Sequence, residues 1–299
     1  MGCLAPRRAR RVVGRDFAAR FDRSGARPGR AGLRLRADRS AERPGAVNLL
    51  GLDLAWKPER NPSALAIWCT HDAAGTALEQ PRAWLYPALR SSAEVQACIL
   101  QHAGSSALLA VDAPLIVRNP TGQRACEAQL NADFRRHHAG AHPSNLQLYP
   151  EAETARLADA LRAGGFAWFP RQGVATAPAQ RWQAEVYPHP AQITLLGRDR
   201  ILAYKRGSVA ERRARLAEYQ QLLHQKLQQR LPGFAAAPPI AERFARSPAA
   251  LRGRALKEHE DALDACFCVL IADRLARAKP AELHFYGDHQ QGFIVVPKA

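Results

Sequence analysis

The most constraining feature of the sequence is a short apolar run, residues 48–56 (NLLGLDLAW), that carries one acidic residue, Asp53. Polar, charged sequence bounds the run on both sides, which is typical of a buried β-strand. Because strand side chains alternate between the two faces, Leu49, Gly51 and Asp53 are expected on one face. Charged side chains are rarely buried unless they are paired or bind a metal ion. Asp53 therefore needs a partner, and other acidic residues indicate its nature.

A second apolar run, residues 107–116 (ALLAVDAPLI), carries Asp112 in the same way. Two carboxylates on neighbouring parallel strands would repel each other, and a cation between them would relieve that repulsion. A buried strand has no comparable structural use for an acid. Asp53 and Asp112 are therefore the leading candidates for a catalytic, metal-binding pair.

Three further acids join the candidate site. Asp261 and Asp264 are three residues apart on a predicted helix, so they share a face, which continues into the apolar Cys268 and Ile271. An acid early in a helix also stabilises the helix dipole, which is the alternative interpretation of Asp261. Glu185 begins the motif EVYPHP on a predicted strand.

The donor types favour a particular metal. Carboxylate oxygens without nearby cysteines are typical of Mg²⁺ or Mn²⁺ sites rather than of zinc sites. Two such ions activate a water and stabilise the leaving oxygen of a phosphodiester. The residues alone thus predict metal-dependent phosphoryl hydrolysis, with Asp53, Asp112, Asp261 and Asp264 as metal ligands and Glu185 as a fifth catalytic acid.

The chain divides into an N-terminal extension and one main domain. Residues 1–46 hold 13 of the arginines, no lysine and four acids, and show no sustained apolar period, so we expect them to be disordered. A nucleic-acid arm, an organellar presequence and an extension without function all remain open for them. Residues 47–299 are long enough for a single domain.

Periodicity predicts a mixed α/β fold for the main domain. Closely spaced strands form an antiparallel meander, and a helix capped by Ser92 crosses over to the strand with Asp112, in parallel. A polar insertion spans about residues 118–180. The meander strands are predicted at residues 48–56, 63–70 and 83–86, and later strands at 183–187 and 292–297. Helices are predicted at residues 124–136, 154–163, 209–230 and 257–278, with a loop at 232–239.

Charge indicates the class of partner. The formal net charge is +16, and residues 197–216 alone carry seven basic against two acidic residues. Such a patch can follow phosphates, although it is also what a solvated helix face looks like. Nucleic acid is the predicted partner, and no feature requires an obligate protein partner. The candidate substrate contacts are Arg124, His142, Asn145, Lys205 and Arg206.

The sequence also excludes some classes. No run of about 18 apolar residues is present, so no membrane span is expected. The six cysteines form no C-x-x-C pair, which favours reduced, buried thiols in a cytoplasmic protein.

Several motifs carry a family resemblance. The order of meander, crossover helix, acid-bearing strand and late acid-bearing helix resembles the ribonuclease-H-like fold, which includes RuvC-type resolvases. More specifically, the chain resembles the bacterial domain-of-unknown-function family 429, described as a predicted nuclease. The matching stretches are GLDLAW with NPSALA, VDAPLIVRNPTGQRACE, HHAGAHPSN, EVYPHPA, YKRGSVAERR, RGRALKEHEDALDA and GFIVVP.

The resemblance implies a metal-dependent nuclease in which Asp53 and Asp112 fall at metal-ligand positions and Asp261 and Asp264 match the acid pair on the closing helix. Two alternatives stay open. One is a nucleic-acid-binding module without turnover, and the other is a hydrolase of a small phosphorylated or nucleotide substrate enclosed by the insertion.

Overall fold

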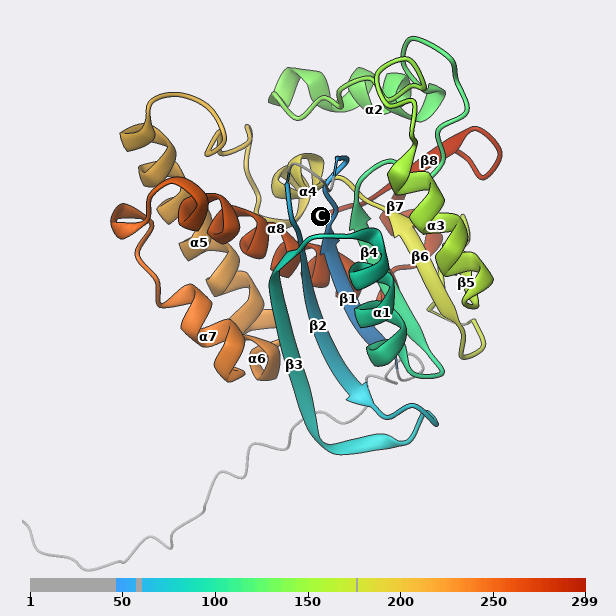
Figure 1. Cartoon of the computed structure of the whole chain (residues 1–299), viewed down its shortest axis with the longest axis horizontal. Helices are drawn as coiled ribbons and strands as arrows, with labels where there is room; N and C mark the ends of the chain where they lie inside the picture. The colour runs from blue at the N-terminus through green and yellow to red at the C-terminus, as the bar shows by residue number, and fades with distance from the viewer. Residues whose placement is uncertain (1–46, 58–60, 176) are drawn as a thin grey trace, which may run out of the picture. The chain divides into compact units, whose positions relative to one another are not determined.

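The computed structural model describes residues 47–57, 61–175 and 177–299 (Figure 1). Residues 1–46, predicted to be disordered, lie outside the described part. The strands are β1 (Asn48–Asp53), β2 (Ser63–His71), β3 (Ala77–Leu89), β4 (Ala107–Asp112), β5 (Phe166–Trp168), β6 (Arg181–Glu185), β7 (Leu283–Asp288) and β8 (Gly292–Pro297). The α-helices are α1 (Ser92–Ala103), α2 (Ala125–Phe134), α3 (Glu153–Ala163), α4 (Pro188–Leu195), α5 (Val209–Arg230), α6 (Pro232–Ala236), α7 (Pro238–Phe244) and α8 (Gly253–Arg277).

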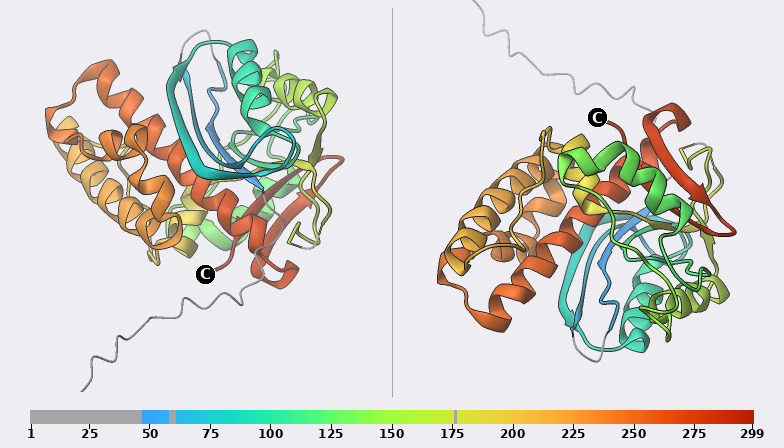
Figure 2. Two further views of the ribbon diagram at one scale, coloured as in Figure 1. Left: turned by 90° about the horizontal axis from the view of Figure 1, so that it is seen from below. Right: turned by 90° about the horizontal axis from the view of Figure 1, so that it is seen from above.

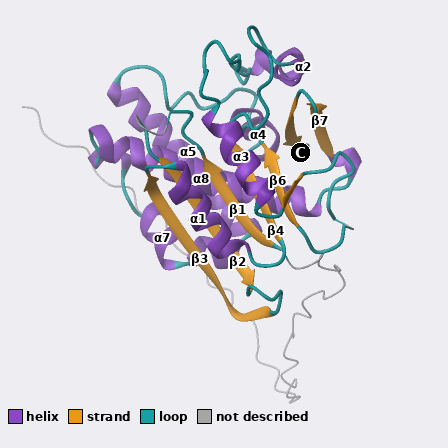
Figure 3. Ribbon diagram, turned by 45° about the vertical axis from the view of Figure 1, so that its right-hand side comes forward, coloured by secondary structure: helices purple, strands orange, loops and turns teal. Residues whose placement is uncertain are grey.

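The main sheet has six strands in the order β3-β2-β1-β4-β6-β5, and β3, β2, β1, β4 and β6 can be followed side by side in Figure 3. β1, β2 and β3 pair antiparallel, whereas β4 runs parallel to β1, β6 to β4, and β5 to β6. The predicted meander, the parallel crossover and the mixed α/β class are therefore confirmed. β7 and β8 form a separate hairpin sheet, which a bridge between Val186 and Val295 ties to the end of β6.

Each face of the main sheet has its own apolar core. Leu50 and Leu52 of β1 point to one face, where their core includes Val95 of α1 and Leu157 of α3. Leu49 belongs to the opposite core, with α8 and α5. Figure 1 shows α1 and α3 in front of the sheet and α8 behind it, and Figure 2 shows α5, α6 and α7 grouped on the side of α8. Asp53 follows Leu49 and Gly51 on the α8 face, as the alternation predicts.

Gly51 sets the distance between β1 and α8. A Cβ at this position would lie 2.3 Å from both the carbonyl oxygen of Ala265 and the amide nitrogen of Val269. The atoms in the way belong to the helix backbone, so no side-chain movement could relieve the clash. The helix therefore lies directly on the strand, two residues before Asp53 along β1 and about one helical turn after Asp261 and Asp264 along α8.

The helix prediction was accurate where an apolar stripe was long. The predicted helix at residues 209–230 is α5, and its stripe of Leu216, Tyr219, Leu223 and Leu227 is fully buried. Its N-cap is Ser208, which forms a capping box with Glu211.

Short elements were missed or misplaced. The loop predicted at residues 232–239 is wrong, because α6 occupies Pro232–Ala236 and α7 begins at Pro238. Both helices begin with proline, which is tolerated at the first helical position. α4 also begins with proline, at Pro188, just after the strand predicted at residues 183–187, which in the structure is β6 and ends at Glu185. The N-cap of α1 is Ser91 rather than Ser92, since the Ser91 side chain accepts a hydrogen bond from the Glu94 amide.

Among the described residues, no helix combines the length and the apolar composition needed to cross a bilayer. This agrees with the expectation from the sequence.

Substituting Gly51 with alanine should destabilise the fold by about 3 kcal/mol or more, at the upper end of overpacking costs, because the added methyl meets backbone atoms. Urea unfolding followed by circular dichroism measures the change. Gly164→Ala is the control, since its Cβ would meet the flexible end of Leu100 at 3.0 Å and its φ of −80° suits alanine. Equal stability losses in the two variants would contradict the close packing of α8 on β1.

Candidate active site

The two strand acids lie side by side at the ends of β1 and β4. Asp53 and Asp112 are register partners in the parallel pairing of these central strands. Asp53 lies four residues after Leu49 on β1, and Asp112 lies four residues after Leu108 on β4. Each acid therefore shares a strand face with a residue of the core on the α8 side of the sheet. Because α8 rests on Gly51, its N-terminal half places Asp261 and Asp264 close enough to raise the pKa of Asp53. Four of the five predicted catalytic acids are thus brought together, and we call Asp53, Asp112, Asp261 and Asp264 the acidic cluster.

The acidic cluster carries more negative charge than its surroundings compensate. Burial first, and then the neighbouring acids Asp261, Asp264 and Asp112, raise the pKa of Asp53 well above its usual range, while Lys205 opposes this. Burial and the nearby carboxylates likewise raise the pKa of Asp112 to about 7, again against Lys205. Close like charges and desolvation both disfavour ionisation, so the arrangement favours binding of a cation.

Lys205 supplies the cation within the structure. Its ammonium nitrogen lies 2.7 Å from Oδ2 of Asp264, whose side chain is fully buried, although the lysine side chain as a whole is 40% exposed. A partly exposed lysine thus pairs with a fully buried carboxylate. The sequence predicted Lys205 as a substrate contact, and the structure places it inside the acidic cluster.

Asp264 differs from the other three acids because its second oxygen is engaged. Oδ1 accepts hydrogen bonds from the hydroxyl groups of Tyr204, at 2.5 Å, and Tyr219, at 3.1 Å. The two tyrosine rings are stacked with centroids 4.6 Å apart. Asp264 therefore anchors the loop before α5 to α8, in addition to its ion pair with Lys205.

Asp261 keeps one oxygen free. Its Oδ1 contacts Lys257 one turn earlier on α8, while Oδ2 is buried without a hydrogen-bond partner among the described residues. An unpaired carboxylate oxygen inside a protein is costly, so it marks a place for a bound cation or water.

Glu185 borders the acidic cluster without sharing its strand face: it lines the same small cavity as Asp112, and its charge helps to raise the pKa of Asp112. On β4 its register partner is Val111, which faces the α1–α3 core rather than α8. Its two oxygens accept hydrogen bonds from Arg124, at 2.5 and 2.9 Å, and from the Leu115 amide. Glu185 therefore holds the segment after β4 in place.

The side chain of Arg124 is bonded within the same network. Besides Glu185, its guanidinium donates to Glu127 at 2.8 Å and to the Ile116 carbonyl at 3.0 Å, and the side chain is 2% exposed. Glu127 in turn accepts hydrogen bonds from Ser144. The predicted substrate contact Arg124 is thus a buried tie between β6, α2 and the insertion.

Of the remaining predicted substrate contacts, one is buried and bonded within the protein, and two line cavities. The Asn145 side chain is buried and bonded to the Gly122 carbonyl and the Leu148 amide. His142 and Arg206 line cavities beside the acidic cluster and remain suitable for contact with a ligand.

His189 is a residue that the prediction omitted. Burial, and then the positive charge of Lys205, lower the pKa of its imidazole to about 4, so it is neutral at pH 7. The Tyr187 hydroxyl donates to the Gly140 carbonyl and lies 3.0 Å from Nδ1 of His189. Because that hydroxyl has one proton, we assign the imidazole proton to Nδ1, which leaves Nε2 as an acceptor. The histidine-proline pair of EVYPHP was the available signal.

Two cavities share lining residues near the acidic cluster, and the smaller one reaches Asp112. A small one, of about 80 Å³, is lined by Asp112, Glu185, His142 and Tyr187 among others. An open one, of about 510 Å³, shares His142 and Ala141 with it and is bordered by Arg135 and Arg206. We call the second cavity the basic groove. Its lining is Gln123, Asn131, Arg135, His138, Gly140, Ala141, His142, Pro143 and Arg206.

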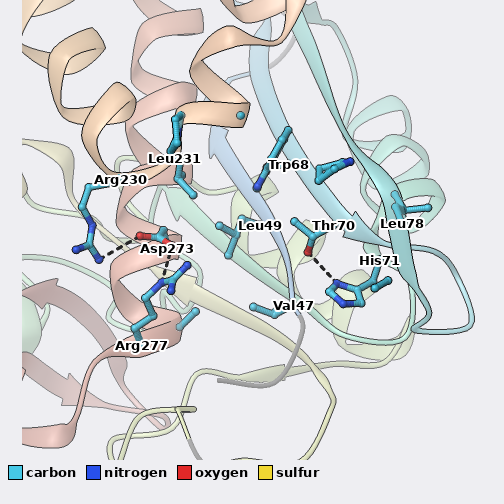
Figure 4. Close-up of a pocket in the computed structure, with 15 residues that line it drawn as sticks. Val47, Leu49, Trp68, Thr70, His71, Leu78, Arg230, Leu231, Asp273 and Arg277 are labelled. Atoms are coloured by element: carbon cyan, nitrogen blue, oxygen red, sulfur yellow. Dashed lines mark hydrogen bonds and ion pairs between the residues drawn. The ribbon is translucent and has the colours of Figure 1, made fainter. Parts of the chain in front are cut away.

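A further cavity, of about 590 Å³, lies at the opposite end of β1, around Val47 and Leu49 (Figure 4). Arg230 and Arg277 both point to Asp273 there, with the closer contact at 2.8 Å. Its charged groups are paired with one another, so it does not share the uncompensated charge of the acidic cluster.

The acidic cluster offers the donor atoms that a divalent cation prefers, but its side chains are not arranged around one. The acidic cluster offers hard oxygen donors from three elements and the unpaired Oδ2 of Asp261. Even so, within residues 47–57, 61–175 and 177–299, no three Asp, Glu, His or Cys side chains are arranged to hold an ion. Lys205 provides the nearby positive charge in this arrangement.

Comparison with known proteins gives one match. The family model described as "Protein of unknown function (DUF429)" matches residues 51–290, which contain every residue of the acidic cluster. No curated protein sequence and no solved structure matches the chain.

Replacing Asp112 with asparagine should stabilise the metal-free protein. The pKa of Asp112 is about 7 when folded and near 3.8 when unfolded, so the contribution of Asp112 to wild-type stability falls as pH rises between these values and then levels off. The raised pKa of Asp53 adds a decline that both proteins share. The variant lacks the decline due to Asp112 and should be more stable at pH 8 by on the order of 2 kcal/mol. Chemical unfolding in EDTA from pH 4 to 8 measures it.

Asp264→Asn is the matched comparison for that experiment. It loses the ion pair with Lys205 and disturbs the two tyrosine hydrogen bonds, so it should be less stable than wild type throughout the pH range. If both asparagine variants shifted stability in the same direction, the distinction between an uncompensated and an anchored acid would be wrong.

Arg124→Ala should destabilise the fold by about 3–5 kcal/mol, because it leaves buried Glu185 and Glu127 without their counter-charge. Adding Glu185→Gln should recover part of the loss by removing one of the stranded charges. Denaturant unfolding of the single and double variants provides the measurement. Unchanged stability with weakened nucleic-acid affinity would instead assign Arg124 to substrate binding.

Proposed function

This chain belongs to the DUF429 family of proteins of unknown function, and from its own residues we propose that it hydrolyses phosphodiester bonds in nucleic acid with the help of a bound divalent cation. The observation that carries the proposal is the pairing of Asp53 and Asp112 at adjacent strand ends, with α8 acids against them and too little positive charge nearby. As part of the proposal we assign the fold to the ribonuclease-H-like group, on the order of meander, crossover helix and acid-bearing strand.

In this proposal three of the acids would bind the metal ion and the fourth would hold a loop. Asp53, Asp112 and the free oxygen of Asp261 would hold Mg²⁺ or Mn²⁺, and Asp264 would keep the adjoining loop in place. When bound, such an ion supplies positive charge for the phosphate and lowers the pKa of a water. The surplus negative charge raises the pKa values of Asp53 and Asp112 in the metal-free state, and that same surplus favours cation binding.

His189 is suited to orienting the attacking water. Its Nδ1 is held by Tyr187, so Nε2 presents a lone pair, and the charges acting on the imidazole include Lys205 and Asp264. With a pKa of about 4 the imidazole is a weak base at pH 7, so it is suited to accept a hydrogen bond rather than a proton. We therefore assign Nε2 of His189 the role of orienting the attacking water.

The basic groove favours a polymeric substrate over a small one. Arg135 and Arg206 border an open groove of about 510 Å³ that adjoins the small cavity beside Asp112. A strand of nucleic acid laid along it would meet positive charge before its phosphate reached the acids. The small cavity holds about 80 Å³, well below the roughly 300 Å³ at which ligand pockets begin, so it cannot enclose a nucleotide.

Cleavage of labelled nucleic acids by the full-length chain tests the proposal. Single-stranded, double-stranded, hybrid and branched substrates are incubated with Mg²⁺ or Mn²⁺. Asp53→Asn and Asp112→Asn should each reduce cleavage by more than about 100-fold, the upper limit for losing only a supporting group of a metal site. Glu79→Gln, which removes an exposed carboxylate at the far end of the sheet, should cut like wild type.

The same substrates separate the rival functions. A binding module without turnover would retain salt-dependent affinity and cut nothing in either metal. Arg135→Ala should weaken nucleic-acid binding and lower the salt dependence of the affinity by about one phosphate contact. Bound substrate should still be cleaved. Wild-type protein that folds, binds and never cleaves would overturn the hydrolase proposal.

A further inference from the structure

We propose that the cavity at the N-terminal end of β1 binds a small molecule that combines a flat aromatic ring with one anionic group, a carboxylate or a phosphate. This cavity holds about 590 Å³, within the range of roughly 300–1,000 Å³ that is typical of small-molecule pockets. It lies at the end of β1 opposite Asp53, so a ligand bound there leaves the acidic cluster open. The inference is therefore independent of the proposed hydrolysis.

The first support is an excess of positive charge on the helix side of the cavity. Arg230 and Arg277 are the last residues of α5 and α8, and both point to Asp273 (Figure 4). Arg277 donates to Oδ1 of Asp273 at 2.8 Å, and Arg230 lies 3.5 Å from Oδ2. Asp273 is the one acid among the described residues that line the cavity. Two guanidinium groups share its carboxylate, which leaves one positive charge for an anionic ligand.

The second support is that both guanidinium groups are held in place and can still be reached. The Asp273 side chain is 1% exposed, whereas those of Arg230 and Arg277 are 43% and 46% exposed. The buried acid therefore holds two charged groups beside the cavity while solvent has access to them. An arginine guanidinium binds a carboxylate or a phosphate through two parallel hydrogen bonds, so this arrangement suits either anion.

The third support is an aromatic ring on the strand side of the cavity. Trp68 of β2 is the register partner of Leu49, and both residues line the cavity. Phe234 packs edge-on against the Trp68 ring, with the ring centroids 6.0 Å apart. A Cβ on Gly233 would lie 3.0 Å from the same ring, so glycine lets α6 pack closely against it. The indole is thus fixed but remains partly exposed, and a flat ligand ring can stack on it.

The fourth support is a fixed polar rim beside that ring. The buried Asn48 side chain accepts hydrogen bonds from the amides of Thr70 and His71 and donates one to the His71 carbonyl. The Thr70 hydroxyl lies 2.8 Å from Nδ1 of His71, a contact that Figure 4 marks with a dashed line. These contacts hold the end of β2 in place. The cavity therefore has its shape before a ligand arrives, as most ligand pockets do.

Calorimetric titration of the full-length chain in EDTA tests the inference with four probes. Naphthoate and naphthyl phosphate carry both the ring and an anionic group, and comparing the two distinguishes a carboxylate ligand from a phosphate ligand. Naphthamide keeps the ring without the charge, and cyclohexanecarboxylate keeps the charge without the aromatic ring. At least one of the two aromatic anions should bind, and it should bind about 10-fold more tightly than naphthamide, because only the anion bonds to the guanidinium groups. It should also bind more tightly than cyclohexanecarboxylate.

Variants locate the binding site. Arg230→Gln should weaken binding of the aromatic anion by about 10-fold or more, since it removes the charge that pairs with the anion. Trp68→Leu should weaken it by about 3- to 10-fold, the range expected for a lost aromatic contact. Arg254→Gln is the control, because it removes an exposed arginine that also pairs with an acid, at the other end of α8, and it should bind like wild type.

Circular dichroism checks the fold of each variant, and Arg230→Gln decides the test if Trp68→Leu folds poorly. Failure of both aromatic anions to bind at about 1 mM would overturn the inference, and so would equal affinity for naphthamide. Binding that Arg230→Gln or a folded Trp68→Leu variant leaves unchanged would overturn it as well. Because EDTA excludes divalent ions, each of these outcomes leaves the hydrolase proposal intact.

Discussion

The contact between α8 and β1 is the constraint on which the rest of the site depends. Gly51 has no Cβ, so the helix backbone lies directly on the central strand, where any other residue would place a methyl 2.3 Å from helix backbone atoms. This contact brings acids from the far end of the sequence to Asp53 and Asp112. The same glycine thus fixes the packing of the core and the composition of the acidic cluster.

The acids of this protein serve two different physical purposes. Glu185, Glu127 and Asp264 are compensated by arginine, lysine, tyrosine or backbone donors, and they join elements that are distant in sequence. Asp53 and Asp112 have no ion-pair partner among the described residues, and their raised pKa values mean that the metal-free fold disfavours their ionised forms, while Asp261 keeps one oxygen unpaired beside its contact with Lys257. Groups that destabilise a fold in this way are expected at functional sites, where a ligand offsets the cost.

The sequence could predict what depends on local pattern. The apolar runs with a central acid gave Asp53 and Asp112, and the stripe of Leu216, Tyr219, Leu223 and Leu227 located α5 to the residue. It could not predict contacts made by loops. Arg124 and Glu185 were predicted as site residues, but they bind each other. The ion pair between Lys205 and buried Asp264 depends on the loop that Tyr204 attaches to Asp264, and no local sequence pattern indicates that contact. Short helices beginning with proline were missed because they lack a full apolar period.

The central claim is that the uncompensated acids bind a divalent cation, and a crystal structure of the full-length chain soaked in Mn²⁺ tests it most directly. Anomalous scattering locates manganese without reference to activity. The account predicts a peak within about 2.0–2.3 Å of oxygens from Asp53, Asp112 and Asp261, close to the usual bond lengths of Mg²⁺ and of somewhat larger hard ions. Saturating Mn²⁺ with no peak at these carboxylates, or with peaks only elsewhere on the protein, would contradict it.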